Sequence, residues 1–450
     1  MVKKLTARIL VLEKENSELR DKLGLNSTNS SLPPSKDLYK IEKENKPKST
    51  LKIGAQPGHI GKNRARKAPD KIIHCYAPET CNCGGRIIMH KKPEIQQKIE
   101  IPPITPIYTD YILHKGRCKN CNKKYSGTLP QGVSQNMLAA HAKTIVTSLT
   151  GYYKNSKSEV QQILKNIFNL EISTGTISNT EARVSDKCER LYDEYCHQIQ
   201  NSDHLHIDET GAKKQGKRHW AWCFTDQKTT VLKIEKSRSK EVLKKMLPNF
   251  TGTIISDRYG SYNYFNANQR QICWAHLIRD FNRFANSNNS EVKKIGIQLK
   301  NCSRFLFKNL KFFKENVLAL QKGPPEKIAS LLTKKYNMLC TLVSKIKQAV
   351  RSRLEKIMSI SDAKHASRVA KRILKLEEMM WKFMDFIFTI SPTNNLAERQ
   401  IRPFVIYRKN SFFVWSERGA KFVERMNSIL LTSNLRKLNS FQVLHEVIKS

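Results

Sequence analysis

The chain has 450 residues, more than one hydrophobic core usually supports, so we expect roughly two to four structural units. It carries 80 lysine and arginine residues against 39 aspartate and glutamate residues, which gives a formal net charge of +41. This excess strains a compact fold by self-repulsion, which a polyanion such as double-stranded DNA relieves. The alternative is a lysine-rich genome whose bias only decorates the solvated surface.

Membrane insertion and secretion are not expected. No apolar stretch approaches the roughly 18 residues that span a bilayer, and the first residues lack the small-residue cleavage site of a signal peptide. The 11 cysteines are scattered over a long chain, which favours reduced thiols and a metal cluster over a disulfide framework. We therefore expect a cytoplasmic, nucleoid-associated protein with no membrane partner.

Heptad spacing predicts a coiled-coil helix over residues 1–25. One apolar heptad position holds Val2, Ile9, Asn16 and Leu23, and the other holds Leu5, Leu12 and Leu19. Asparagine at such a position favours a parallel dimer, and the alternative is a short helix that packs on its own protein.

Residues 26–70 are rich in Ser, Pro, Gly and Lys and predict a flexible basic linker. It would either contact DNA phosphates or act only as a tether.

Paired cysteines predict a zinc-finger-like module over residues 71–130. The pairs are Cys81 with Cys83 in a C-x-C spacing, and Cys118 with Cys121 in a C-x-x-C spacing. Stretches between them, such as IEIPPITPIYTDYIL, predict strands, so the whole suits a zinc ribbon with one structural Zn²⁺ ion. Because C-x-C is tighter than a usual knuckle, Cys75 or His74 is an alternative ligand. Buried cysteines acting as small apolar residues are a further alternative.

Residues 131–200 predict a helical, helix-turn-helix-like DNA-binding region. The stretch KSEVQQILKNIF precedes a break at NLEIST, and a second helical stretch begins at GTISNTEARVSDK. Ser173 or Thr174 is expected to cap the second helix. Residues near its start are expected to reach base edges, namely Thr176, Ser178 and Asn179. The alternative is a helix pair that never touches DNA.

Short apolar stretches over residues 201–280 predict the first part of an RNase H-like catalytic core in an α+β multidomain protein. The hairpin-like strands HLHID, HWAWCFTD and TTVLKIEK precede a helix, the strand GTIISD and a last strand RQICWAH. Asp208 closes the first strand and Asp257 closes the fourth. In that order the first and fourth strands lie side by side, so both carboxylates are expected at one metal-binding edge.

A third acid is expected within residues 391–450, the predicted C-terminal helices of the core. In SPTNNLAERQIRP, Ser391 is predicted to cap a helix and Pro392 to occupy its first turn, with Glu398 following. Phosphodiester cleavage uses two divalent ions, Mg²⁺ or Mn²⁺, which carboxylate oxygens hold, so the three acids are predicted to bind them. Neighbouring basic residues are expected to contact DNA phosphates: Arg399, Arg402, Arg408 and Lys409.

A Lys-rich, apolar-periodic block over residues 281–390 predicts a large helical insertion between the second and third acids. It is expected to position DNA or a partner subunit, or to buttress the sheet.

The C-x-x-H pair of Cys273 and His276 follows Asp257 and is expected to be structural, with contact of His276 to the scissile phosphate as the alternative. Trp274 is expected in the core. His206, two residues before Asp208 on the same strand face, is expected to be a satisfied core histidine, with a position near the metals as the alternative.

Three long segments carry a resemblance to a known family. HIDETG, ISDRYGSY followed by CWAHLIRDF, and NNLAERQIRPFVIYRKNSFF resemble signature blocks of the insertion sequence 66 transposase family, a bacterial group with a DDE triad. The N-terminal segments resemble that family too, except that it more often shows C-x-x-C where this chain has C-x-C. The resemblance places Asp208, Asp257 and Glu398 at the catalytic positions and implies DNA cleavage and strand transfer at element ends.

The resemblance also implies assemblies. A transposase that joins two element ends acts as a homodimer or a larger synaptic complex, and accessory proteins of the element are possible partners. Two other interpretations stay open: a non-catalytic DNA-binding regulator, and an RNase H-like nuclease that acts on RNA. Taken singly, a strand-end Asp usually caps a turn and a helix Glu usually pairs with an Arg, so the interpretation depends on their combination.

Overall fold

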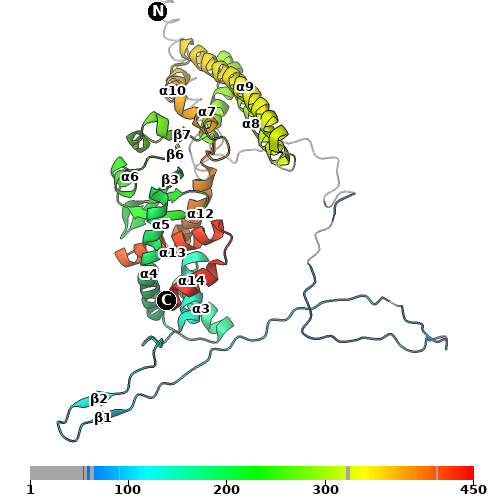
Figure 1. The fold of residues 1–450 in the computed structure, drawn as a ribbon, viewed down its shortest axis with the longest axis vertical. Helices are drawn as coiled ribbons and strands as arrows, with labels where there is room; N and C mark the ends of the chain where they lie inside the picture. Colours follow the sequence, from blue (N-terminus) through cyan, green and yellow to red (C-terminus); the bar gives the residue numbers. More distant parts are fainter. Residues whose placement is uncertain (1–53, 55–57, 61–64, 91, 321–324, 412–413) are drawn as a thin grey trace, which may run out of the picture.

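The computed structural model describes most of the chain from residue 65 onward (Figure 1). The described residues are 54, 58–60, 65–90, 92–320, 325–411 and 414–450. The predicted coiled-coil helix over residues 1–25 lies outside the described residues, as does most of the predicted linker over residues 26–70. Both therefore stay predictions.

Residues 65–90 and 92–134 run mostly as extended chain away from the helical body (Figure 1). Its two short strands, β1 (Lys115–Arg117) and β2 (Lys124–Ser126), pair antiparallel. The prediction of strands in IEIPPITPIYTDYIL is wrong, because residues 99–113 form none. Three prolines in that stretch lack the N–H that a ladder requires, and apolar side chains such as Ile107, 93% exposed, have no surface to pack on.

Helices occupy most of the next segment. They are α2 (Ala140–Thr147), the π-helical turn η2 (Ser148–Tyr152), α3 (Lys157–Phe168), α4 (Thr174–Lys187) and α5 (Glu189–Gln200). As predicted, α3 and α4 flank a short turn: Asn169 ends α3 with a left-handed φ of 50°, and the Ser173 hydroxyl caps α4 by accepting from the Thr176 N–H at 3.1 Å. Val160, Leu164 and Ile177 are buried between them.

A mixed five-stranded sheet forms the centre of the molecule. Its elements are β3 (His204–Lys214), β4 (Lys217–Thr225), β5 (Thr230–Glu235), β6 (Thr253–Ser256) and β7 (Arg270–Ile272), with α6 (Lys240–Met246) between β5 and β6. The spatial order is β5-β4-β3-β6-β7, antiparallel within the first three strands and parallel across β3, β6 and β7. The predicted adjacency of the first and fourth strands is confirmed.

Two predicted strand ends are wrong. Asp208 does not close β3, because antiparallel pairing with β4 continues that strand to the pair Lys214–Lys217. The last strand does not include CWAH, since β7 ends at Ile272 and Cys273 occupies the cap position of helix α7 (Trp274–Ala285). Pairing with a neighbouring strand, rather than the chain's own apolar pattern, fixes both ends.

Helix α13 (Glu417–Leu435) closes the β5 edge of the sheet. Side chains four residues apart on the helix meet alternate backbone N–H groups of the strand: Glu424 accepts from Ile234 at 2.7 Å, Ser428 from Leu232 at 2.9 Å and Thr432 from Thr230 at 2.9 Å. Four helical residues and two strand residues both advance about 6 Å, so the two repeats match. The edge N–H groups are thereby satisfied inside the protein.

A second, all-helical layer follows β7. It contains α7, α8 (Ser290–Leu320), α9 (Pro325–Ser359), α10 (Lys364–Leu374), α11 (Glu377–Met380) and the 3-10 turn η5 (Lys382–Met384). The long helices α8 and α9 lie side by side and project from the body (Figure 1). The predicted core residue Trp274 is fully buried here, and its indole N–H donates to the Met380 carbonyl at 2.6 Å.

The chain returns to the sheet after this layer. Helix α12 (Asn395–Asn410) packs on β3 and β4, and α14 (Ser440–Lys449) packs on α13 and α2. Apolar residues around the sheet form one core, and those of the α7–α11 layer form another. Within the described residues, every helix is too short or too polar to span a lipid bilayer.

Candidate active site

Asp208 and Asp257 lie just beyond the paired part of the two adjacent parallel strands β3 and β6. The last pair between these strands is His206 with Ile255, and each aspartate lies two residues further along the chain than its member of that pair. Parallel strands keep this register, so the two carboxylates come to one edge of the sheet. Asp257 directly follows β6, where the Tyr259 N–H donates to its Oδ1 at 2.8 Å.

The acids influence one another electrostatically. Burial, together with the negative charges of Glu209, Asp257 and Glu398, raises the pKa of Asp208 to about 8. A carboxyl group with so high a pKa needs a positive charge beside it to be ionised at neutral pH. This edge of the sheet therefore has the electrostatic character of a cation site.

Glu398 lies in the first turn of α12, but Ser391 does not cap that helix as predicted. The cap position belongs to Asn394, and the Ser391 hydroxyl instead bonds within its own turn, donating to the Thr393 carbonyl at 2.8 Å. A serine can bond locally in this way and so delay the start of a helix. The first turn consequently begins three residues later than the sequence pattern predicts.

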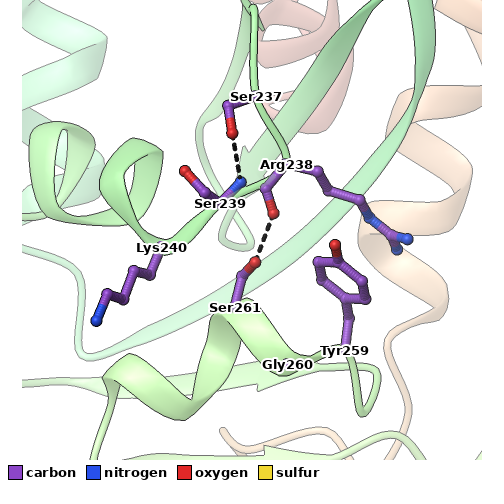
Figure 2. A pocket seen from close by; sticks show the side chains of 7 residues that line it. All are labelled: Ser237, Arg238, Ser239, Lys240, Tyr259, Gly260 and Ser261. Atoms are coloured by element: carbon purple, nitrogen blue, oxygen red, sulfur yellow. Dashed lines mark hydrogen bonds between the residues drawn. The ribbon is translucent and has the colours of Figure 1, made fainter.

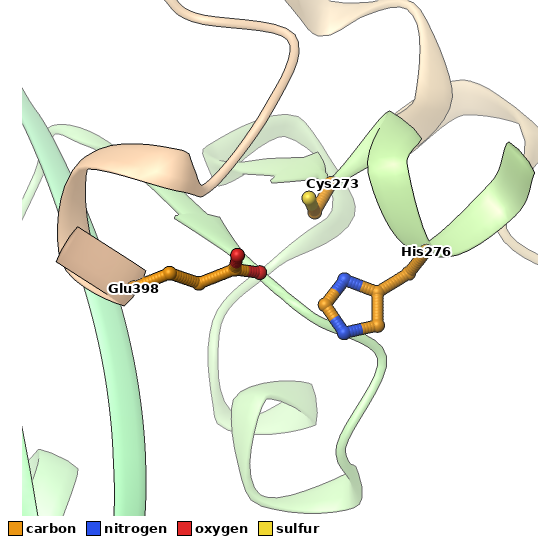
Figure 3. A group of neighbouring side chains, drawn as sticks. All are labelled: Cys273, His276 and Glu398. Carbon is orange, nitrogen blue, oxygen red and sulfur yellow. The ribbon is translucent and has the colours of Figure 1, made fainter. Parts of the chain in front are cut away.

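The Glu398 carboxylate points toward the Cys273 thiol and the His276 ring (Figure 3). Ligand atoms of these three side chains all lie within 4.8 Å of one another, and the Arg279 guanidinium lies 3.9 Å from Glu398. In the described part of the chain no other three potential ligands are so close together. The structure therefore brings Glu398 to the same region as Asp208 without gathering the three acids as tightly.

Two histidines border the acids in their neutral form. Burial lowers the pKa of both His206 and His276 to about 4, and for His276 the charge of Arg279 acts in the same direction. The prediction that His206 is a satisfied core residue is confirmed, because it is buried and its Nδ1 lies 3.1 Å from Asn394 Oδ1. The Nδ1 of His276 is buried and has no hydrogen-bond partner among the described residues.

A basic pocket of about 420 Å³ adjoins Asp257. We call it the Arg238 pocket; its lining residues are Ser237, Arg238, Ser239, Lys240, Tyr259, Gly260 and Ser261 (Figure 2). The Arg238 guanidinium lies 3.6 Å from the centre of the Tyr259 ring and 4.0 Å from the Asp257 carboxylate. A cation, an aromatic ring and hydroxyl groups in one hollow suit the phosphate and sugar of a nucleic-acid strand.

Arg238 also holds a buried acid that sequence reasoning missed. Its guanidinium pairs with Glu209 at 2.5 Å, and the Glu209 side chain, 1% exposed, accepts in addition from the Tyr262 hydroxyl. Burial and the charge of Asp257 raise the pKa of Glu209. The only signal in the sequence was the adjacent pair of acids in HIDETG, since the partners lie in distant segments.

The predicted phosphate contacts on α12 divide into two groups. Arg399, Arg402 and Lys409 are exposed and free to meet a ligand. Arg408 is half-buried and donates to Thr210 Oγ1 at 2.9 Å and to the Gly211 carbonyl, so it holds α12 against β3.

In α4, the helix predicted to read DNA, the Ser178 hydroxyl accepts from Lys157 at 2.5 Å, whereas Asn179 is exposed.

The predicted zinc ligands form two separate turns. Cys81 N–H donates to the Gly85 carbonyl at 2.8 Å, and Cys118 N–H donates to the Lys123 carbonyl at 2.9 Å, which gives each pair a tight local turn. Neighbouring hydrogen bonds lower the pKa of Cys83 and Cys118. The two pairs do not meet in one cluster of ligands within the described residues. Zinc binding therefore stays a prediction.

Comparison with known families decides the identity. The family model described as "Transposase IS66 family" matches residues 157–422, more than half of the chain and all three acids. The chain belongs to the IS66 family of transposases. In the transposase, residues 1–65 also match a family of unknown function. No curated protein matches the chain. Membership implies a transposase role, with DNA as partner and DNA cleavage and transfer as the general activity.

The raised pKa of Asp208 predicts a pH-dependent stability of the metal-free transposase. A carboxyl group that keeps its proton only when folded contributes stability fully below its unfolded pKa, near 4, and loses it as the pH rises through about 8. We expect thermal stability in EDTA to fall across that range, and Asp208→Asn to make the fall smaller. Melting curves at several pH values test this, and an unchanged slope in the variant would contradict it.

Proposed function

We propose that the transposase cuts double-stranded DNA at element ends and joins it to target DNA, with Asp208, Asp257 and Glu398 holding two divalent cations. The observation that carries this proposal is that Asp208 and Asp257 lie at one edge of the sheet, where burial first, and then the charges of Glu209, Asp257 and Glu398, raise the pKa of Asp208 to about 8. Such repulsion is costly unless a cation lies between the carboxylates. The five-stranded order supports an RNase H-like core around them.

The donor set fits hard cations. Carboxylate oxygens are the ligands that Mg²⁺ prefers, and Mn²⁺ accepts the same set. When bound, such ions activate a water or a 3′-hydroxyl as nucleophile and stabilise the leaving oxygen. The nearby thiol of Cys273 is fully buried, and burial raises its pKa, so it is a poor ligand for a hard ion.

The chain's other residues would hold and orient the DNA. The Arg238 pocket lies beside Asp257 and would take a phosphate of the strand next to the cut. Exposed Arg399, Arg402 and Lys409 follow Glu398 on α12 and would contact further phosphates. His276 is neutral, and its buried Nδ1 lacks a protein partner in the described chain. Its expected role is structural, with contact to the scissile phosphate as the alternative.

The remaining parts would serve assembly and recognition. A coiled coil over residues 1–25 would pair two copies, the α3–α4 pair would read the element ends, and a zinc-binding module over residues 71–130 would add DNA contacts. A homodimer or larger synaptic complex, with accessory proteins of the element, would bring two ends together. Nucleoid association would follow from DNA binding.

The test is a cleavage assay with purified full-length transposase. Labelled duplex DNA that carries the element's two ends is incubated with Mg²⁺ or Mn²⁺, beside an RNA–DNA hybrid of the same sequence. We expect cuts at the element boundaries and joined products from the DNA duplex alone. Cleavage of only the hybrid would point to a ribonuclease, and DNA binding without any cleavage would point to a regulator; either outcome would overturn the proposal.

A further inference from the structure

Asn394 connects the segments that carry two of the acids. It is fully buried, with 0% of its surface exposed, between β3 and the first turn of α12. Its side-chain amide donates to the Ile207 carbonyl at 2.7 Å, the residue directly before Asp208. Because the nitrogen donates there, the amide oxygen faces His206 and accepts from its Nδ1 at 3.1 Å.

The Asn394 backbone is held as firmly as its side chain. Its N–H donates to the Cys273 thiol at 3.1 Å, at the start of α7 and directly after β7. Its carbonyl accepts from the Glu398 N–H at 3.2 Å, the first hydrogen bond of α12. A further backbone bond runs beside it, from the Trp274 N–H to the Pro392 carbonyl at 2.9 Å.

These contacts bury a polar side chain in the core. Burying a polar group costs more free energy than burying an apolar one, so a buried asparagine is expected only where its hydrogen bonds are needed. Both the amide nitrogen and the amide oxygen of Asn394 have a hydrogen-bond partner. Each partner is a backbone or ring atom of a residue within two positions of Asp208. Only an asparagine offers a donor and an acceptor at this reach: an aspartate lacks the donor, and an alanine lacks both.

We propose that Asn394 is a positioning residue that fixes the distance of Glu398 from Asp208, with Cys273 as its second support. The inference rests on the proposed function, since it assigns how the third metal ligand is placed. Groups that orient a metal ligand act on metal affinity, and their loss typically weakens it by about 10- to 100-fold. Asn394 touches neither substrate nor cation in this scheme.

The experiment measures DNA cleavage as a function of Mn²⁺ concentration for Asn394→Ala and Asn394→Asp. The matched control is Asn395→Ala, an exposed neighbour in the same helical turn. We expect both Asn394 variants to need at least about 10-fold more Mn²⁺ for half-maximal cleavage, with the rate largely restored at saturating Mn²⁺. The control is expected to match the wild type.

A merely structural role would appear differently. Melting curves taken in EDTA report general destabilisation, and a rate that falls with the folded fraction but keeps the wild-type Mn²⁺ dependence would overturn the inference. Should Asn394→Ala not fold, the isosteric Asn394→Asp decides the question by the same Mn²⁺ titration. Direct Mn²⁺ binding to the wild type, followed by electron paramagnetic resonance, distinguishes failure of the proposed function from failure of this inference. If the wild type binds no Mn²⁺, the proposed function is wrong. If it binds Mn²⁺ and the Asn394 variants keep the wild-type Mn²⁺ dependence, only the role of Asn394 is wrong.

Discussion

Asp257→Asn is expected to lower DNA cleavage and strand transfer by at least about 10³-fold, because losing a metal ligand removes several kcal/mol of transition-state stabilisation. The amide oxygen can still accept the Tyr259 N–H that now bonds Asp257 at 2.8 Å, so the loop should keep its shape. The negative charge that attracts a cation is lost. Binding of element-end DNA should stay within about twofold, since basic residues elsewhere carry it.

The control for this substitution is Asp203→Asn, which removes an exposed carboxylate just before β3. Cleavage of end-labelled duplex and a mobility-shift measurement on the same DNA provide the two readouts. A regulator would bind DNA equally well in all three forms and would cut with none of them. Equal cleavage by wild type and Asp257→Asn would show that the reaction does not depend on this acid.

Arg238→Met is expected to destabilise the sheet by about 3–5 kcal/mol, the usual cost of leaving a buried charge without its partner. The guanidinium lies 2.5 Å from Glu209, whose side chain is 1% exposed and stands near Asp257. Without Arg238 the pKa of Glu209 in the folded protein rises further above its unfolded value. The free energy of unfolding of the variant therefore falls more steeply as the pH increases. The loss should therefore be larger near about pH 8 than near about pH 5, as measured by urea unfolding with tryptophan fluorescence.

A second substitution separates charge from packing in this prediction. Glu209→Gln in the Arg238→Met background removes the stranded charge and keeps an oxygen that accepts from the Tyr262 hydroxyl. We expect the double variant to recover most of the lost stability and to lose the pH dependence. If it is as unstable as Arg238→Met alone, the stacking of Arg238 on Tyr259 and Trp220, rather than its charge, is what stabilises this region.

The sequence was sufficient to place the strands of the central sheet and, with them, two of the acids. The alternating Leu205 and Ile207 mark β3, and the adjacent Ile254 and Ile255 mark β6. The parallel register follows once the order of the strands is known, which puts Asp208 and Asp257 at one edge. Strand length was harder to predict, because β3 continues past Asp208 only through its pairing with β4. Such partners lie outside the local window that a sequence pattern covers.

Supporting residues could not be predicted, for the same physical reason. Asn394 contacts His206 and Cys273, which are more than a hundred residues away, and Glu209 depends on Arg238 and Tyr262. Nothing local distinguishes Asn394 from Asn395, although one is buried and the other exposed. The cap of α12 was misassigned because Ser391 has the usual residue type but bonds within its own turn.

The most direct test of the central claim is a crystal structure of the transposase with element-end DNA and Mn²⁺, in which anomalous scattering locates the ions. We predict anomalous density for Mn²⁺ ions that lie within coordination distance of the carboxylate oxygens of Asp208, Asp257 and Glu398. Mn²⁺ bound elsewhere, with Glu398 turned away from both aspartates in the presence of DNA, would contradict the account.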